Sequence, residues 1–178
     1  HTPKTSVRTR PPNGETPTVI WVTMPRSPTE DQELKKAALA ILGVLVLVYI
    51  AAIFVTNDPD EQKPGTRLSG NLAEDQNPDW SFLDGRTKAY IETRSLYLIP
   101  HSITVSSWSE NGQLYVGCRA CDTKYWPKNV VGDPNIRIKI DGKIYKRRAV
   151  RLSDEERDAI IKSDKPMPGM GLFRIDPR

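Results

Sequence analysis

The chain has 178 residues and carries 26 lysines and arginines against 22 aspartates and glutamates, which leaves a net charge of +4. This length allows one or two domains. A positive charge this small gives no reason to expect nucleic acid as a partner. Fifteen prolines favour extended or irregular stretches in part of the chain.

The first part of the chain predicts an extended tail over residues 1–26. Residues 1–18 are rich in Thr, Pro and Arg and show no apolar periodicity, a composition typical of disorder. Residues 18–25, TVIWVTMP, form a short apolar island. This island suits either a strand or a patch on a membrane surface, with Trp21 at the level of the headgroups.

An uncharged apolar run from Ala37 to Val55 follows, and a helix over it would be about 28 Å long, close to the roughly 30 Å of a bilayer core. A buried core helix would carry polar residues on one face, and this run has none. A cleaved signal peptide is the competing interpretation, but the run is long for one and lies well inside the chain. The sequence therefore predicts a transmembrane helix with a polar N-terminal extension over residues 27–56, with Ser27 as its N-cap.

The charges that flank this run predict its orientation. Lys35 and Lys36 precede it, whereas Asp58, Asp60 and Glu61 follow it. Positive charge favours the cytoplasmic side, so the tail is expected inside and the rest of the chain outside. In a bacterium, this places a single-pass protein in the inner (cytoplasmic) membrane with its C-terminal domain in the periplasm.

Residues 57–79 are polar and are expected to form a linker to an extracytoplasmic domain over residues 80–178. Residues 80–94 suggest a short helix or turn, and a capping box of Ser153 and Glu156 begins an amphipathic helix. Turn sequences separate short β-rich stretches, which lie at residues 96–108, 113–118, 135–140, 143–152 and 171–175.

About five short strands and two helices within roughly one hundred residues favour a small, strongly bent barrel over a parallel sheet. The expected fold class is therefore a single transmembrane α-helix plus a small, mainly-β extramembrane domain of the split-barrel-like, α+β type.

One sequence pattern in this domain resembles the split β-barrel of the deazaflavin-dependent nitroreductase family, within the pyridoxamine-oxidase-like flavin-binding group. The similarity covers roughly residues 90–178 and is carried by Trp126-x-x-Asn129-x4-Pro134-x-Ile136, Gly142-Lys143-x-Tyr145 and Ala149-x-Arg151. The resemblance implies a flavin or deazaflavin beside this loop, with Trp126 and Asn129 shaping the wall of its site.

The sequence departs from the family where a phosphate should be held. Asp122 stands where the family usually has a basic residue, Lys124 lies nearby but out of register, and the apolar stretch 95–102 replaces a Gly-, Ser- and Arg-rich turn. A carboxylate is a poor neighbour for phosphate. We therefore expect a retained framework with no cofactor, and a flavin or deazaflavin held by Trp126, Asn129 and Lys124 only in the alternative case.

Cys118 and Cys121 are three residues apart, a spacing found in redox-active, haem-binding and zinc-binding sites. A thioredoxin-like role needs the pair at a helix N-terminus, haem attachment needs His where Asp122 stands, and zinc needs four ligands with only His101 nearby. A loop-closing disulfide or two buried thiols is therefore favoured, and no metal site is expected. His101 itself is interpreted as a structural residue, with a proton-donor or ligand role as the alternative.

The basic stretch 143–151, KIYKRRAVR, favours a solvated strand face, with anionic headgroups or an acidic protein surface as alternatives. A tail without a core of its own needs partners to hold it. We therefore expect a non-catalytic accessory or scaffolding subunit of a bacterial membrane energy-converting complex, respiratory or photosynthetic. Its partners would be the lipid bilayer and other integral-membrane subunits on both sides of it. The alternative is a membrane-anchored, flavin- or deazaflavin-dependent oxidoreductase of the nitroreductase type.

Overall fold

The computed structural model describes residues 5–7, 20–22, 28–61, 63–83, 85–95, 97–162 and 167–178. The chain divides into two compact units, His1–Val48 and Tyr49–Arg178, and each unit is described by itself.

The first unit contains a short strand pair and most of a long helix. Strands β1 (Thr5–Val7) and β2 (Ile20–Val22) pair in antiparallel fashion, so the described part of the apolar island, residues 20–22, is a strand. The remainder of the expected tail, and Ser27 with it, lies outside the described residues. The helix α1 (Pro28–Phe54) begins at Pro28, whose ring suits a first helical turn.

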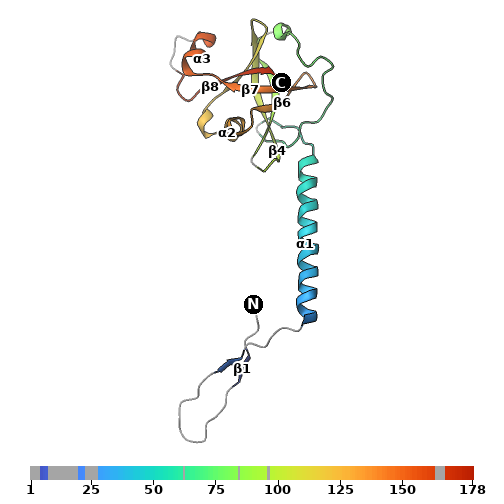
Figure 1. Ribbon diagram of the computed structural model, residues 1–178. Coiled ribbons are helices and arrows are strands. Elements are labelled where there is room, and N and C mark those ends of the chain that lie inside the picture. Colours follow the sequence, from blue (N-terminus) through green and yellow to red (C-terminus); the bar gives the residue numbers. More distant parts are fainter. Residues whose placement is uncertain are drawn as a thin grey trace, which may run out of the picture. The chain divides into compact units, whose positions relative to one another are not determined.

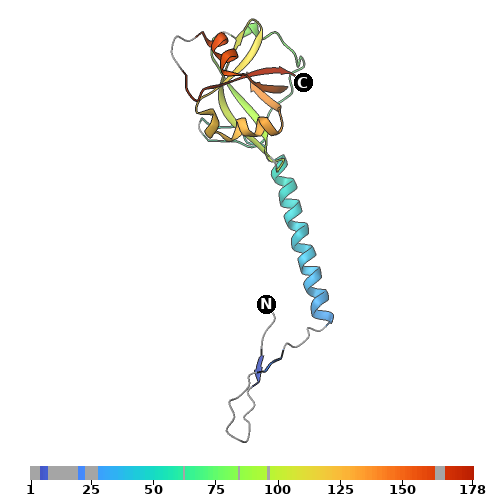
Figure 2. The ribbon, with the colours of Figure 1, turned by 60° about the vertical axis from the view of Figure 1, so that its left-hand side comes forward.

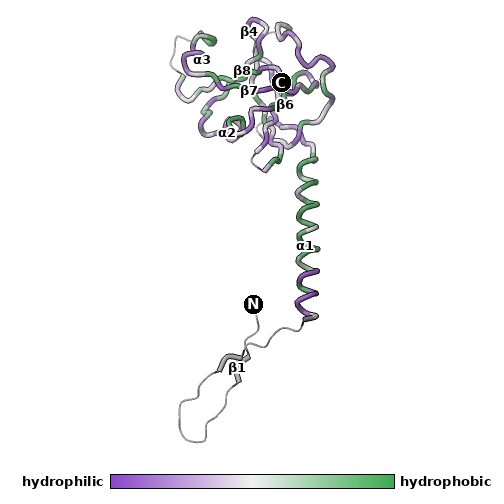
Figure 3. The backbone as a smooth tube through the Cα atoms, viewed as in Figure 1, coloured by the Kyte–Doolittle hydropathy of each residue, from purple (hydrophilic) through white to green (hydrophobic). Residues whose placement is uncertain are grey.

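From Ala37 onward, helix α1 carries no charged side chain on any face. Leu39 and Leu47 are 68% and 67% exposed, and Figure 3 shows mostly hydrophobic colouring through the second half of the helix. Polar side chains occur near its start, where Lys36 forms an exposed ion pair of 2.8 Å with Glu33. The length and composition of α1 suit either a membrane span or a signal sequence.

The second unit is built on a closed barrel of six antiparallel strands (Figures 1 and 2). The order around the barrel is β3-β4-β5-β8-β7-β6, so the last strand of the chain lies between β5 and β7. Closure leaves no unpaired strand edge in the barrel. The strands are β3 (Thr87–Arg94), β4 (Pro100–Glu110), β5 (Gln113–Cys118), β6 (Asn135–Ile140), β7 (Lys143–Arg151) and β8 (Gly171–Pro177).

Alternation along the strands fills the barrel with apolar side chains. In β6, Ile136, Ile138 and Ile140 are buried, whereas the residues between them are half-buried. The turn from β6 to β7 uses Asp141 and Gly142, which both have positive φ, at 48° and 78°. Two consecutive left-handed residues give the twist that a two-residue hairpin needs, so the Asp-Gly turn expected from the sequence is confirmed.

Two helices accompany the barrel. Helix α2 (Tyr125–Gly132) lies at one end of the barrel in both ribbon views and buries Trp126, Pro127 and Val130 (Figures 1 and 2). Helix α3 (Asp154–Ile161) contacts β8 and begins with the expected capping box, in which both reciprocal hydrogen bonds between Ser153 and Glu156 are present.

The prediction of a helix or turn over residues 80–94 is wrong for most of that segment. A single 3₁₀ turn, η1 (Trp80–Phe82), precedes the strand β3, which begins at Thr87. The alternation of β3 is hidden in the sequence because Glu92 and Thr93 are buried alongside the apolar Ile91. A polar residue buried on the outer side of a strand breaks the simple pattern of one polar face and one apolar face.

The segment expected to be a linker, residues 57–79, packs along the outside of the barrel. We call residues 55–80 the strap; all of it except Gln62 is described. Its backbone bonds Gly65 to Ser102 of β4 in both directions, at 2.8 and 3.1 Å, and bonds Ala73 to Ile144 of β7 at 2.9 Å. At its end, Trp80 is buried in the main core.

Charged side chains hold the strap as well. Asp58 accepts from Lys139 of β6 at 2.5 Å and from the backbone of Ser69 at 2.8 Å. The carboxylate of Glu92, which is 4% exposed, accepts from the Leu68 amide at 2.8 Å and from Arg137 at 2.7 Å. Because Glu92 is buried and the other three charged groups are partly buried, these pairs hold the strap more firmly than fully exposed pairs would.

Candidate functional site

A groove of about 910 Å³ lies on the outer side of β4, and segments far apart in the sequence form its walls. The strap contributes Glu61, Lys63 and Pro64, the end of β5 contributes Cys118, and Met170 lies ahead of β8. The remaining wall comes from the turn η2 (Cys121–Thr123) and from the start of α2. This volume is ample for a nucleotide-sized ligand.

Three aromatic residues line the groove, and they differ in how firmly they are held. Trp126 is 4% exposed and packs on Phe173 of β8 with ring centroids 4.6 Å apart, so most of its surface belongs to the core. Trp108 stacks on Tyr115 at 6.1 Å. Tyr125 is 76% exposed and is free to contact a ligand.

Four basic side chains, Lys63, Arg86, Arg119 and Lys124, line the groove with one acid, Glu61. The Arg86 guanidinium lies 5.7 Å from the centroid of the Trp108 ring, close enough for a cation–π contact. An excess of positive charge beside aromatic faces favours a ligand that is both planar and anionic.

His101, which also lines the groove, is half-buried, and this burial lowers the pKa of its imidazole below the ordinary value. The imidazole is therefore neutral at pH 7 and has one nitrogen that donates and one that accepts. Nearby in the same lining, the Thr104 hydroxyl is buried and has no hydrogen-bond partner among the described residues. With the hydroxyls of Ser106 and Thr123, these two groups are neutral polar contacts that the groove offers.

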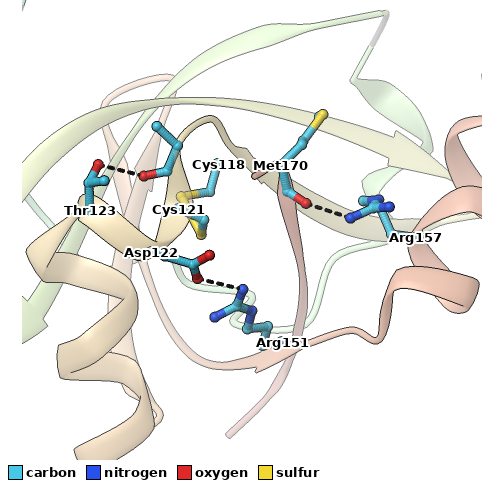
Figure 4. The surroundings of a disulfide bond; sticks show 8 residues. Cys118, Cys121, Asp122, Thr123, Arg151, Arg157 and Met170 are labelled. Atoms are coloured by element: carbon cyan, nitrogen blue, oxygen red, sulfur yellow. Dashed lines mark hydrogen bonds and ion pairs between the residues drawn. A yellow bond between two sulfur atoms is a disulfide. The ribbon is translucent and has the colours of Figure 1, made fainter. Parts of the chain in front are cut away.

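Cys118 and Cys121 are joined in a disulfide with a Cα–Cα distance of 5.2 Å, and both are buried (Figure 4). The bond closes a tight loop in which Ala120 takes a left-handed conformation, with φ of 49°. The bond thus leaves no free thiol at this loop to act as a nucleophile or metal ligand. Within the described part of the chain, no cluster of three or more metal-binding side chains occurs.

Asp122 turns toward β7, where its carboxylate pairs with Arg151 at 3.1 Å (Figure 4). It does not line the groove. The acidic residue that stands where the family has a base is therefore paired with Arg151 and lies outside the lining of the groove.

Only two of the three residues expected to form a cofactor wall lie at the groove. Trp126 and Lys124 line the groove, whereas the Asn129 amide donates to the Thr93 hydroxyl at 3.0 Å and is absent from the lining. Sequence reasoning missed Lys63 and Arg86, because they meet the groove only through the docking of the strap and the closure of the barrel. Arg119, adjacent to Cys118, could have been found from its place in the cysteine loop.

The volume and the charge of the groove suit a flavin or deazaflavin. Of the residues that match the family's motif, however, only some line the groove. Lys124, Arg119 and Arg86 would face the phosphate, and Trp126 and Tyr125 would face the ring system. Asn129 contributes to the barrel instead, and Trp126 offers only a small exposed surface.

Neither a protein-family model nor a curated protein sequence matches the chain. Among solved structures, the chain is similar to General Stress Protein 26 from Bacillus anthracis, with 15% identity, a TM-score of 0.45, and coverage of 57% of this chain and 88% of that one. It is also similar to a NimC/NimA family protein from Clostridium acetobutylicum, with 14% identity, a TM-score of 0.40, and coverage of 50% and 73%. The description of the domain as a six-stranded antiparallel barrel comes from its own strand pairing.

Proposed function

We propose that the chain is a membrane-anchored accessory subunit of a bacterial energy-converting complex, in which α1 spans the inner membrane once. The observation that carries the proposal is the exposed apolar surface of α1, because none of the helix's most hydrophobic stretch is buried against the described residues. Such a surface is stable in lipid or against the helices of other membrane proteins, and not in water.

The charges near α1 support an N-terminus in the cytoplasm and a barrel in the periplasm. Lys35 lies at the N-terminal end of the apolar run, and the strap brings acidic residues directly after it. A disulfide between Cys118 and Cys121 suits an oxidising compartment such as the periplasm.

A non-catalytic role is supported by the structural contacts of the three residues that match or replace the family's motif residues. Trp126 packs on Phe173, Asn129 bonds Thr93, and Asp122 pairs with Arg151. Each of these side chains is engaged in holding the barrel or its loops. The barrel would then act as a rigid periplasmic body that contacts neighbouring subunits.

Purification of the full chain from its native membranes in mild detergent tests this proposal. We expect other integral-membrane chains to co-purify in fixed ratio, and the chain to remain in the membrane fraction after alkaline carbonate washing. Protease added to intact spheroplasts should cleave the barrel side and leave the N-terminal tail protected. Release by carbonate, or isolation as a single species without partners, would contradict the proposal.

A second candidate function is favoured by the groove, whose four basic side chains and aromatic walls suit an anionic, planar cofactor. In that case the chain is a membrane-anchored oxidoreductase, and the flavin or deazaflavin supplies hydride or electron transfer. Lys124 would hold its phosphate, and Trp126 and Tyr125 would border its ring.

Titration of the detergent-solubilised chain with FMN or a deazaflavin, followed by cofactor fluorescence, separates this candidate from the first. Lys124→Gln should weaken binding about tenfold, since it removes one charge-assisted phosphate contact worth about 1.5 kcal/mol or more. Lys143→Gln is the matched control, because Lys143 is exposed on β7 and does not line the groove. The absence of saturable binding to the unmodified chain would exclude the candidate.

A further inference from the structure

We propose that a second site, separate from the groove, binds a phosphate-type oxyanion. This site is a cleft of about 420 Å³ where the strap, the end of β3, the start of β6 and β7 converge. We call it the basic cleft. Neither the family resemblance nor the proposed function assigns a role to it.

Positive charge dominates the lining of the basic cleft. Two acids, Glu92 and Asp133, occur there with five basic residues, namely Arg67, Arg94, Arg137, Lys146 and Arg178. Positive side chains that lie close together repel one another and so destabilise the folded domain. A bound anion would reduce this repulsion.

Both acids are already used inside the fold. Glu92 accepts from Leu68 and Arg137, and Asp133 accepts from the backbone and side chain of Asn135 at 3.0 and 2.8 Å. Glu92 and Arg137 therefore form a buried pair whose charges offset each other, whereas Asp133 keeps its negative charge. Four basic side chains, Arg67, Arg94, Lys146 and Arg178, then remain in the lining against the single carboxylate of Asp133.

Arg94 and Lys146 form the open side of the cleft. Both are exposed, and no ion pair joins either side chain to an acid within the described part of the chain. Arg137 lies deeper, with its side chain 17% exposed, and is fixed by the buried carboxylate of Glu92. The cleft thus has a floor fixed by the Arg137–Glu92 pair and two exposed cationic groups, Arg94 and Lys146, at its open side.

A tetrahedral oxyanion matches this arrangement. A guanidinium offers two parallel N–H donors to a phosphate, and a lysine adds a mobile point charge, so Arg94 and Lys146 supply complementary contacts from two strands. The cleft volume exceeds that of a phosphate group alone, which leaves room for a substituent. Two sources supply this chemistry, a phospholipid headgroup and a soluble phosphate compound.

The first arm of the test titrates pyrophosphate into the full-length chain in neutral detergent, by calorimetry at low and at moderate salt. We expect saturable binding that weakens with salt, and at least a tenfold loss in the double variant Arg94→Gln, Lys146→Gln. The matched control is the double variant Arg148→Gln, Lys143→Gln. It also removes two exposed positive charges, both from β7, but neither residue lines the cleft. It should bind within twofold of the unmodified chain.

The second arm offers phosphatidic acid or phosphatidylcholine to the same proteins and counts the retained lipid by native mass spectrometry. Selective retention of phosphatidic acid by the unmodified chain and the control, but not by the cleft variant, identifies a headgroup as the source. Binding of pyrophosphate alone identifies a soluble phosphate compound. Equal losses in cleft and control variants, or no binding in either arm, would overturn the proposal. Unchanged thermal unfolding midpoints establish that all variants are folded.

Discussion

Glu92 is the residue on which the junction of strap and barrel most depends. It is 4% exposed, and its carboxylate accepts from a strap amide and from Arg137 at once. Replacement by glutamine keeps the shape but leaves the guanidinium without its counter-charge. Removal of one partner from a buried pair costs about 3–5 kcal/mol, so we expect Glu92→Gln to lower the free energy of unfolding by about 3 kcal/mol.

Urea unfolding of the full chain in detergent, followed by tryptophan fluorescence, measures this change. Glu110→Gln is the control, because Glu110 pairs with Lys162 at 3.3 Å at a position where the lysine side chain is 76% exposed. An exposed pair contributes about 1 kcal/mol or less. If both variants lost the same stability, burial of Glu92 would not be the cause.

Gly171 is required by the disulfide that lies against it. A Cβ at this position would lie 2.7 Å from the Cys121 sulfur and 3.2 Å from its Cβ. We expect Gly171→Ala to cost about 1–3 kcal/mol through overpacking, measured by the same urea unfolding. Gly132→Ala is the control, since a Cβ there meets nothing within 4 Å.

The same substitution can be made in a chain with both cysteines replaced by alanine. Much of the cost should then disappear, because the sulfur that crowds position 171 is gone. An undiminished cost in that background would contradict the steric explanation.

At the scale of elements, the strap should respond to acid. Burial raises the pKa of Asp58, but hydrogen bonds from Lys139 and Ser69 outweigh burial, and the net pKa lies below the ordinary value. A depressed pKa in the folded state gives stability that is present above the ordinary value and is lost as pH falls through the folded one. We therefore expect the strap to loosen as the pH drops below about 4.

Unfolding of Asp58→Asn compared with the unmodified chain between pH 7 and pH 3 tests this expectation. The variant should be less stable at pH 7, and the difference should shrink toward pH 3. Asp60→Asn, which removes an exposed carboxylate from the same segment, should give a small difference that does not vary in this way. A constant difference for Asp58→Asn would show that its charge is not the cause.

The elements that could be predicted are those whose pattern is local. The hairpin of β6 and β7 follows from the alternation of isoleucines and from Asp141-Gly142, and α3 follows from its capping box. Strand β3 could not be predicted, because its outer residue Glu92 is buried by a segment that lies 24 residues earlier, at Leu68. The burial of Glu92 depends on a tertiary contact, which cannot be read from the alternation of residues along the strand.

The same reason limits prediction of the candidate site. Trp126 and Lys124 share one loop motif and were found together, whereas Lys63 and Arg86 reach the groove from the strap and from the start of β3. The basic cleft is more dispersed still, since Arg67, Arg94 and Lys146 come from three segments. Charge counts along the sequence do not show which of these side chains meet.

At the scale of the whole molecule, the proposed membrane anchoring depends on the apolar helix α1. Leu45, near the middle of the expected span, is 59% exposed. An arginine at the centre of a membrane helix costs about 2.5–3.5 kcal/mol on insertion scales. We expect Leu45→Arg to reduce the membrane-integrated fraction severalfold, as measured by carbonate extraction.

Leu34→Arg is the control, because Leu34 is also exposed but precedes the apolar run. It should leave integration unchanged. If Leu45→Arg integrated as well as the unmodified chain, α1 would not be acting as a lipid-embedded span.

The order of the segments along the chain also constrains how the domain is made. The strap is synthesised before the barrel, yet Asp58 bonds a lysine 81 residues later, and Gln76 bonds a β7 amide 70 residues later. Contacts this distant in sequence form slowly, since a long loop must close first. The nascent strap therefore lacks its partners until the barrel has been synthesised, and during that interval it is open to a chaperone or a protease.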